Sequence, residues 1–235
     1  MSGVTLSIDD LTERDIAKAI DHSLLRPELD DAFVEGGCRL ALEYDVASVC
    51  VRPADVARAR AILAGSDVAV GTVIGFPHGG HLSKVKAAEA QAATADGAVE
   101  LDMVVNIGKV LSGDWGYVRD DIAAVVEPAH RGGAKVKVIF ENCFLKDEHK
   151  VQLCRICGEV RADWVKTSTG YAETGATIED LKLMRECSPA WVQVKAAGGV
   201  RTFERLMEVR AIGVSRVGAT ATKAILVDAK AKLGG

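Results

Sequence analysis

Residues 135–141 read Lys-Val-Lys-Val-Ile-Phe-Glu, and this short segment is the most informative one about the architecture. Its β-branched residues favour a strand, and the alternation of apolar and charged residues has a period of two. The apolar face of such a strand packs against helices, so the charged face points the other way. The segment therefore predicts a strand whose charged side chains point into the interior of a barrel.

Seven further runs rich in β-branched residues flank this segment, and helical patterns separate them. The expected strands are Ile20–Leu24, Val46–Val51, Val68–Ile74, Ala98–Val104, Lys135–Phe140, Asp163–Thr167, Trp191–Lys195 and Ser215–Val217. Their starts lie about 22 to 37 residues apart, the length of a strand–helix unit. Eight units predict an α/β protein with a single (β/α)8 TIM-barrel domain over residues 1–235. A doubly wound open sheet, the alternative, usually carries a G-x-G-x-x-G motif, which this sequence lacks.

The segments between the strands have the periodicity of amphipathic helices. We expect helices over His81–Ala95, Trp115–His130, Thr177–Glu186 and Phe203–Ile212. In the first of these, Leu82, Val85, Ala88 and Ala92 share one side, and we expect that side to face the core. An extra N-terminal helix, at about Asp9–Lys18, is expected before the first strand.

Composition limits the possible function classes. The 235 residues are 49% hydrophobic and 26% charged, and 29 basic residues against 33 acidic ones give a net charge of -4. Binding to nucleic acid or to an anionic membrane needs a basic face, which this balance argues against. Because the sequence shows neither a membrane-spanning run nor a secretory signal pattern, we expect a cytoplasmic protein.

The six cysteines include one C-x-x-C pair, Cys154 and Cys157. A zinc site would need a second pair or a histidine cluster nearby in the sequence, and neither follows. Helical spacing puts both residues on one face, so we expect ordinary buried thiols and no metal site.

Charged residues recur on the inward phase of several strands, mostly near their carboxyl ends, where barrel active sites are built. They include Glu100, Asp102, Lys137, Lys166 and Lys195. Two facing lysines depress each other's pKa through like-charge repulsion and shared desolvation. A neutral amine can attack a carbonyl and form a Schiff base without metal or organic cofactor, and Asp102 can relay protons. Spacing alone leaves open which of the lysines is the nucleophile.

Glycine-rich segments follow the last two expected strands. They are Ala197–Arg201 and Arg216–Thr220, and each precedes an expected helix. Exposed backbone N–H groups and helix N-termini after strands seven and eight form the usual phosphate site of a barrel. Lys166–Gly170 adds further donors, so we expect phosphate or another small anion to bind here.

At these residues the sequence resembles the deoxyribose-phosphate aldolase (DeoC) family, whose members are class I, Schiff-base aldolases. The matching stretches are Ile20–Leu25, Ser48–Val51, Val73–Pro77, Glu100–Asn106, Lys137–Glu141, Val165–Gly170, Val194–Arg201 and Arg216–Ala219. The resemblance implies reversible cleavage of 2-deoxy-D-ribose 5-phosphate to D-glyceraldehyde 3-phosphate and acetaldehyde, with no cofactor. It also implies a homo-oligomer, dimeric or tetrameric.

The resemblance further implies a role for individual residues. Lys166 would form the Schiff base, Lys195 would tune the pKa of Lys166, and Asp102 would act with Lys195 in proton transfer. The expected substrate-binding residues are Asp21, Ser23, Thr167, Gly170, Gly198, Gly199, Gly218 and Thr220.

The departures from the family pattern are Ser23, Arg52, Asn142, Tyr171 and Ala221. Tyr171 stands where some relatives place a lysine, and Ala221 lacks a hydroxyl that Thr222 could replace. We therefore expect a weaker preference for the phosphorylated sugar. Two other functions stay open at this stage. One is a phosphosugar lyase or isomerase without a covalent intermediate, and the other is a non-catalytic phosphosugar sensor.

Overall fold

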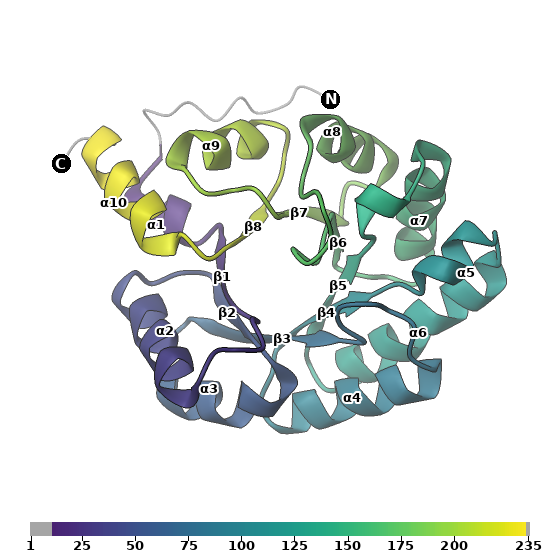
Figure 1. The fold of residues 1–235 in the computed structure, drawn as a ribbon, viewed down its shortest axis with the longest axis horizontal. Helices are drawn as coiled ribbons and strands as arrows, with labels where there is room; N and C mark the ends of the chain where they lie inside the picture. Colours follow the sequence, from purple (N-terminus) through teal and green to yellow (C-terminus); the bar gives the residue numbers. More distant parts are fainter. Residues whose placement is uncertain (1–10, 234–235) are drawn as a thin grey trace.

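A computed structural model describes residues 11–233, and its eight parallel strands close into a barrel in sequence order (Figure 1). The strands are β1 (Ile20–Leu24), β2 (Ser48–Val51), β3 (Ala69–Ile74), β4 (Glu100–Val104), β5 (Lys135–Ile139), β6 (Trp164–Lys166), β7 (Gln193–Ala197) and β8 (Arg216–Ala219). Because β1 pairs in parallel with β8, the sheet has no open edge. The expected (β/α)8 barrel is confirmed, and the doubly wound alternative is excluded.

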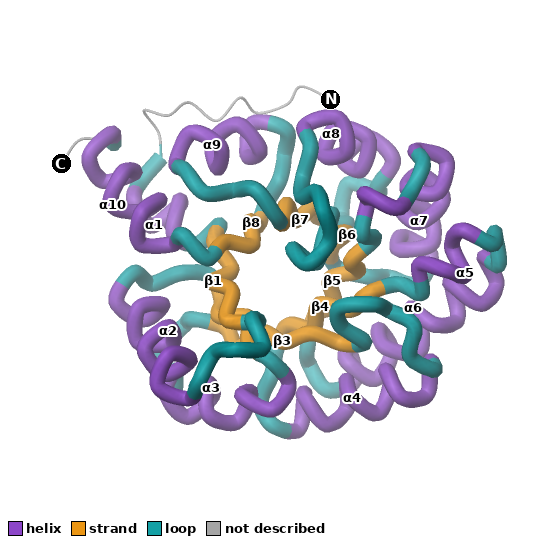
Figure 2. The backbone as a smooth tube through the Cα atoms, viewed as in Figure 1, coloured by secondary structure: helices purple, strands orange, loops and turns teal. Residues whose placement is uncertain are grey.

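The helices form an outer ring around the strands (Figure 2). They are α1 (Glu13–Ala17), α2 (Asp31–Glu43), α3 (Val56–Ile62), α4 (Ser83–Ala95), α5 (Ile107–Leu111), α6 (Trp115–Arg131), α7 (Asp147–Glu159), α8 (Ile178–Cys187), α9 (Phe203–Ala211) and α10 (Thr222–Lys232). Within the described residues, two short 3-10 helices cover Pro53–Asp55 and Asn142–Phe144. Across residues 11–233, none of the helices has the length and apolar character that crossing a membrane requires.

The expected N-terminal helix is present but shorter. It starts at Glu13 because Thr12 is its N-cap, and the side chains of Thr12 and Asp15 form a capping box. The beginning of the expected range, Asp9–Asp10, lies outside the described residues. At the other side of the barrel, β7 runs two residues beyond its expected end at Lys195. Its pairing with β8 continues through Ala197, opposite Gly218.

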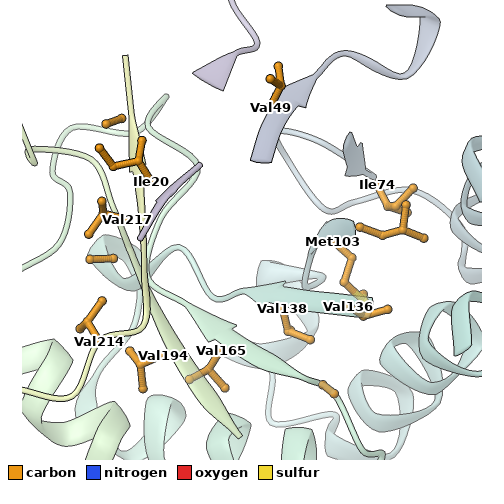
Figure 3. Close-up of a cluster of buried hydrophobic side chains, with 14 of the residues drawn as sticks. Ile20, Val49, Ile74, Met103, Val136, Val138, Val165, Val194, Val214 and Val217 are labelled. Atoms are coloured by element: carbon orange, nitrogen blue, oxygen red, sulfur yellow. The ribbon is translucent and has the colours of Figure 1, made fainter. Parts of the chain in front are cut away.

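The alternation within the strands sorts side chains as expected. Outward-facing residues pack into the layer between strands and helices, as Ile20, Val136, Val165, Val194 and Val217 do in Figure 3. The opposite phase sends charged side chains into the barrel, which is why lysines and carboxylates meet on its axis. Val99 is an exception: it precedes β4 and is 46% exposed.

The prediction of which side of α4 is buried is wrong. Leu82 is 60% exposed and Val85 is 45% exposed, whereas Lys86 is fully buried. The Lys86 ammonium lies 2.6 Å from a carboxylate oxygen of Asp121 on α6 and 2.9 Å from the carbonyl oxygen of Val104. Alanines occupy both sides of α4, so the apolar pattern did not fix its rotation, and this buried ion pair faces inward instead.

The C-x-x-C pair lies on α7 as two buried free thiols, in agreement with the expectation. Burial raises the pKa of Cys154 to about 12 and raises that of Cys157 well above its usual value. Both groups are therefore protonated at neutral pH, and neither lies at the mouth of the barrel.

Candidate active site

A fully buried carboxylate, Asp102 on β4, is the centre of the site. One of its oxygens accepts hydrogen bonds from the ammonium groups of Lys166 and Lys195, each at 2.8 Å. The other oxygen accepts from Lys137 at 3.0 Å. The strand register brings these groups together, because Asp102 is level with Lys137 across β4 and β5, and Lys166 is level with Lys195 across β6 and β7.

Two more carboxylates complete the buried cluster. Asp21 on β1 pairs with Lys195 and Arg216 and accepts a hydrogen bond from Ser48 Oγ at 2.7 Å. Glu100, one layer below Asp102, pairs with Lys137 and lies 2.8 Å from Arg216. Such pairing is the condition under which charged groups are tolerated inside a barrel.

The charges of this cluster do not balance. It contains four cations, namely Lys137, Lys166, Lys195 and Arg216, and three carboxylates, namely Asp21, Glu100 and Asp102. One cation is therefore in excess if all seven groups are ionised. Deprotonation of a single lysine makes the cluster neutral.

Lys166 is the lysine that loses its proton most easily. Burial lowers its pKa below the usual value, and the nearby charge of Lys195 lowers it further, although Asp102 opposes both effects. Burial also acts against the charged form of Lys195, but Asp102 and Asp21 outweigh burial and raise the pKa of Lys195. The pKa of Lys137 is raised for the same reason. Lys166 has only part of one carboxylate as its partner, which singles it out among the three.

A cavity of about 190 Å³ opens above this cluster at the carboxyl ends of the strands. Its lining includes Asp21, Ser23, Lys166, Gly170, Lys195, Gly198, Gly199, Gly218 and Thr220. Most of the site residues expected from the sequence thus meet around one space. Asp102 lies beneath the floor, where it contacts both lysines.

Among the expected substrate-binding residues, Thr167 is the one that does not line the cavity. Its hydroxyl donates to the carbonyl oxygen of Ala197 at 3.2 Å and accepts from the Ala197 N–H at 3.1 Å. The side chain is buried between β6 and β7 and holds these two strands together.

Glycine is required at the corner formed by the β7 and β8 loops. Gly198 has a φ of 79°, and a Cβ on it would lie 2.7 Å from the Cα of Gly175. Gly199 follows with a φ of 90°. Both conformations favour glycine and leave backbone exposed to the cavity, as an anion site needs.

Two departures from the family pattern, Arg52 and Asn142, have structural roles outside the cavity. Arg52 binds Asp55 and the carbonyl oxygens of the β1–α2 loop. Asn142 is buried, with its amide 3.3 Å from the sulfur of Met184. Thr222 is also buried and lies 2.8 Å from Nδ1 of His22, so its hydroxyl does not replace the one missing at Ala221.

Sequence reasoning missed several residues of the site. Arg26 and Cys50 line the cavity, and Arg216 binds two carboxylates below it. Arg26 stands two residues after β1, in a loop at the carboxyl ends of the strands, and that position was the available signal. Within residues 11–233, no group of three His, Cys, Asp or Glu side chains is arranged to hold a metal ion.

These features define a (β/α)8-barrel enzyme, since a buried amine of lowered pKa opens into a cavity where barrel active sites are built. The model of the DeoC/LacD family aldolases matches residues 15–224. The deoxyribose-phosphate aldolase of Rhodopirellula baltica is 55% identical over 225 residues, or 96% of this chain and 93% of that protein. The corresponding enzyme of Clostridium perfringens is 48% identical over 92% of this chain and 96% of its own.

Comparison with solved structures points to the same family. The tetrameric deoxyribose phosphate aldolase of Aeropyrum pernix superposes with a TM-score of 0.85 at 29% identity, over 92% of this chain and 91% of that chain. The chain belongs to the DeoC/LacD family of aldolases. It is therefore a carbon–carbon lyase.

Proposed function

We propose that this aldolase reversibly cleaves 2-deoxy-D-ribose 5-phosphate to acetaldehyde and D-glyceraldehyde 3-phosphate through a Schiff base on Lys166. The observation that carries the proposal is the state of Lys166, a buried amine of lowered pKa that faces the cavity and shares one oxygen of Asp102 with Lys195. The relatives from Rhodopirellula baltica and Clostridium perfringens, named for this substrate, support it.

The reaction needs one amine and one proton relay. Neutral Lys166 attacks the C1 aldehyde, and loss of water gives an iminium ion. A base takes the proton of the C3 hydroxyl, and the C2–C3 bond breaks. Its electron pair moves into the iminium to form an enamine, while C3 becomes the aldehyde carbon of D-glyceraldehyde 3-phosphate, which leaves. Protonation at C2 and hydrolysis then release acetaldehyde and regenerate the lysine. Asp102 and Lys195 are the groups beside Lys166 that can pass these protons.

The substrate would extend from Lys166 toward the glycine corner. Asp21 and Ser23 would contact its hydroxyl groups, because both line the cavity. The phosphate would lie at the outer end, against the residues Gly170, Gly198, Gly199, Gly218 and Thr220. For Thr167 we propose a structural role, since its hydroxyl is already engaged with Ala197. We keep the cytoplasm as the expected site of action.

Trapping with borohydride tests the mechanism. Incubation with acetaldehyde and borohydride should leave an ethyl group on Lys166, found by peptide mapping. The Lys166→Met variant is the control and should remain unmodified and inactive. An adduct confined to Lys195 or Lys137 would contradict the assignment of the nucleophile. If no lysine is modified while the wild type remains active, the lyase works without a covalent intermediate and the proposed mechanism is wrong.

A further inference from the structure

We propose that Arg26 selects for the phosphate group of the substrate and that Tyr171 positions it. The inference rests on the proposed function and names the residue that sets its specificity. Arg26 lies in the β1–α2 loop and lines the same cavity as Gly199 and Thr220. Because β1 pairs with β8, this loop is next to the β8–α10 loop at the phosphate corner.

Tyr171 spans the mouth of the barrel and supports Arg26. Figure 2 shows the loop between β6 and α8, which carries Tyr171, bending inward over the opening. The Tyr171 hydroxyl donates to the carbonyl oxygen of Leu25 at 2.8 Å, and its ring meets that of Phe76 edge-on at 5.3 Å between centroids. The guanidinium carbon of Arg26 lies 5.9 Å from the centroid of the Tyr171 ring. Such stacking on the ring face leaves the N–H edge of an arginine free to bind an anion.

The β1–α2 loop that carries Arg26 is held in place. The Arg52 guanidinium donates to the carbonyl oxygens of Arg26, Pro27 and Leu29, at 3.4, 3.3 and 2.9 Å. Asp55 fixes Arg52 in turn, at 2.7 Å. A loop that is already fixed loses little backbone conformational entropy when its arginine binds a ligand.

The loop that carries Tyr171 is anchored as well. The buried carboxylate of Glu141 accepts hydrogen bonds from the amide and the hydroxyl of Thr169. That hydroxyl accepts from the N–H of Tyr171 at 3.1 Å. The ring on which Arg26 rests is therefore fixed from below and from the side.

The charge of Arg26 is available to a ligand. Within the described part of the chain it takes part in no ion pair, whereas the neighbouring Arg52 is paired with Asp55. Glu28, on the same loop, is not paired with it either. A phosphate at the glycine corner would therefore meet backbone N–H groups and two guanidinium groups, because Arg201 also lines the cavity and, within residues 11–233, takes part in no ion pair. Arg26 is the one of the two that stacks on Tyr171, and together they suit a dianion.

Tyr171 and Ala221 alone predict a weaker preference for the phosphorylated sugar. With Arg26 at the cavity, the expected preference is stronger instead. In place of a lysine after Gly170, the chain carries an aromatic ring that supports a cation from another loop. A sugar without phosphate has no group for Arg26 to bind, so Arg26 favours the phosphorylated sugar alone.

The test compares Arg26→Gln with Arg161→Gln. Arg161 is a matched control because it also stacks on an aromatic ring, 5.4 Å from the centroid of Trp191, but it precedes β6 and so lies at the opposite end of the barrel. The quantity measured is the kcat/KM for 2-deoxyribose 5-phosphate divided by that for 2-deoxyribose. Arg26→Gln should lower this ratio by about tenfold, the effect of losing one charge-assisted hydrogen bond at an exposed position. Arg161→Gln should change it by less than about twofold.

Two further variants test the arrangement. Arg26→Lys should recover part of the ratio, since it restores the charge without the planar fork. Tyr171→Phe, which loses only the bond to Leu25, should lower the ratio by raising KM for the phosphorylated sugar while kcat holds. An unchanged KM in Tyr171→Phe would remove the positioning role.

Failure of the inference and failure of the proposed function give different results. If the wild type cleaves neither sugar, the proposed function is wrong. If the wild type is active and Arg26→Gln keeps the wild-type ratio, Arg26 does not select for phosphate, although the aldolase reaction stands.

Discussion

At the scale of the residue, the inward lysines differ in pKa because one carboxylate, Asp102, is divided unevenly among three of them. Lys137 has Asp102, Glu100 and Asp21 around it and stays protonated. Lys166 shares a single oxygen of Asp102 with Lys195. Identical side chains thus differ in pKa because their numbers of buried partners differ.

Replacing Lys195 should change the protonation state of Lys166. The charge of Lys195 lowers the pKa of Lys166, so Lys195→Met should raise that pKa and reduce the neutral fraction of Lys166 at pH 7. The rise of kcat/KM with pH should therefore move to more alkaline pH, and activity at pH 7 should fall by about tenfold or more. The measurement is the pH–rate profile between pH 6 and 10.

Two control variants accompany it. Lys195→Arg keeps the charge and should leave the profile near its wild-type position. Lys182→Met, on the exposed face of α8, should change nothing. A Lys195→Met profile with an unmoved alkaline rise would show that Lys195 does not act through the pKa of Lys166.

At the scale of the element, buried polar contacts fix how helices meet the barrel and each other. Lys86 and Asp121 form such a contact between α4 and α6, and both are fully buried. His22 on β1 and Thr222 on α10 form another. Removing one partner of such a contact strongly destabilises the protein, because the other partner is left as an unpaired polar group in the core.

For the α4–α6 contact, Lys86→Met alone should destabilise the protein by about 3–5 kcal/mol, because Asp121 is left as an unpaired buried charge. The double variant Lys86→Met with Asp121→Leu should recover most of that loss. Urea unfolding of the two variants and the wild type measures both effects. A single variant as stable as the wild type would mean that the pair contributes nothing to the α4–α6 interface.

For the β1–α10 contact, burial lowers the pKa of His22 from 6.5 to about 4. The folded state therefore holds His22 neutral, while the unfolded chain takes up a proton below pH 6.5. The contribution of neutral His22 to the free energy of unfolding is fully present above pH 6.5, and it is lost as the pH falls from there toward 4. At pH 5 this loss amounts to about 2 kcal/mol relative to pH 7.5.

The variant His22→Gln can bond to Thr222 but does not titrate. Its free energy of unfolding should fall less than that of the wild type between pH 7.5 and pH 5, as urea unfolding at the two pH values will show. Equal losses in the two proteins would mean that His22 titrates normally in the fold.

At the scale of the whole molecule, the barrel leaves apolar side chains on its outer surface. Leu82 and Val85 of α4 and Val227 of α10 are each nearly half exposed or more. Exposed apolar residues favour association, and the relative from Aeropyrum pernix is a tetramer. We expect light scattering to give a mass of two or four chains, and a mass of one chain would contradict this.

Much of the fold and of the site could be predicted from the sequence, because strand order and side-chain phase are local properties. A period of two places Asp102, Lys137 and Lys195 on the inward face without knowledge of any partner. The glycines after β7 and β8 were readable because their position after a strand is itself the signal. The rotation of α4 about its axis could not be predicted, because alanine fits either side of a helix.

Only the tertiary structure showed which of the inward lysines has a lowered pKa and which cavity arginine stacks on Tyr171. Lys166 and Lys195 are 64 and 93 residues from Asp102 in the chain, and their sharing of one oxygen depends on the register of the closed barrel. The pairing of Arg26 with Tyr171 likewise joins the first strand's loop to the sixth's. A pKa and a free charge depend on distances through space, and no local pattern in the sequence records them.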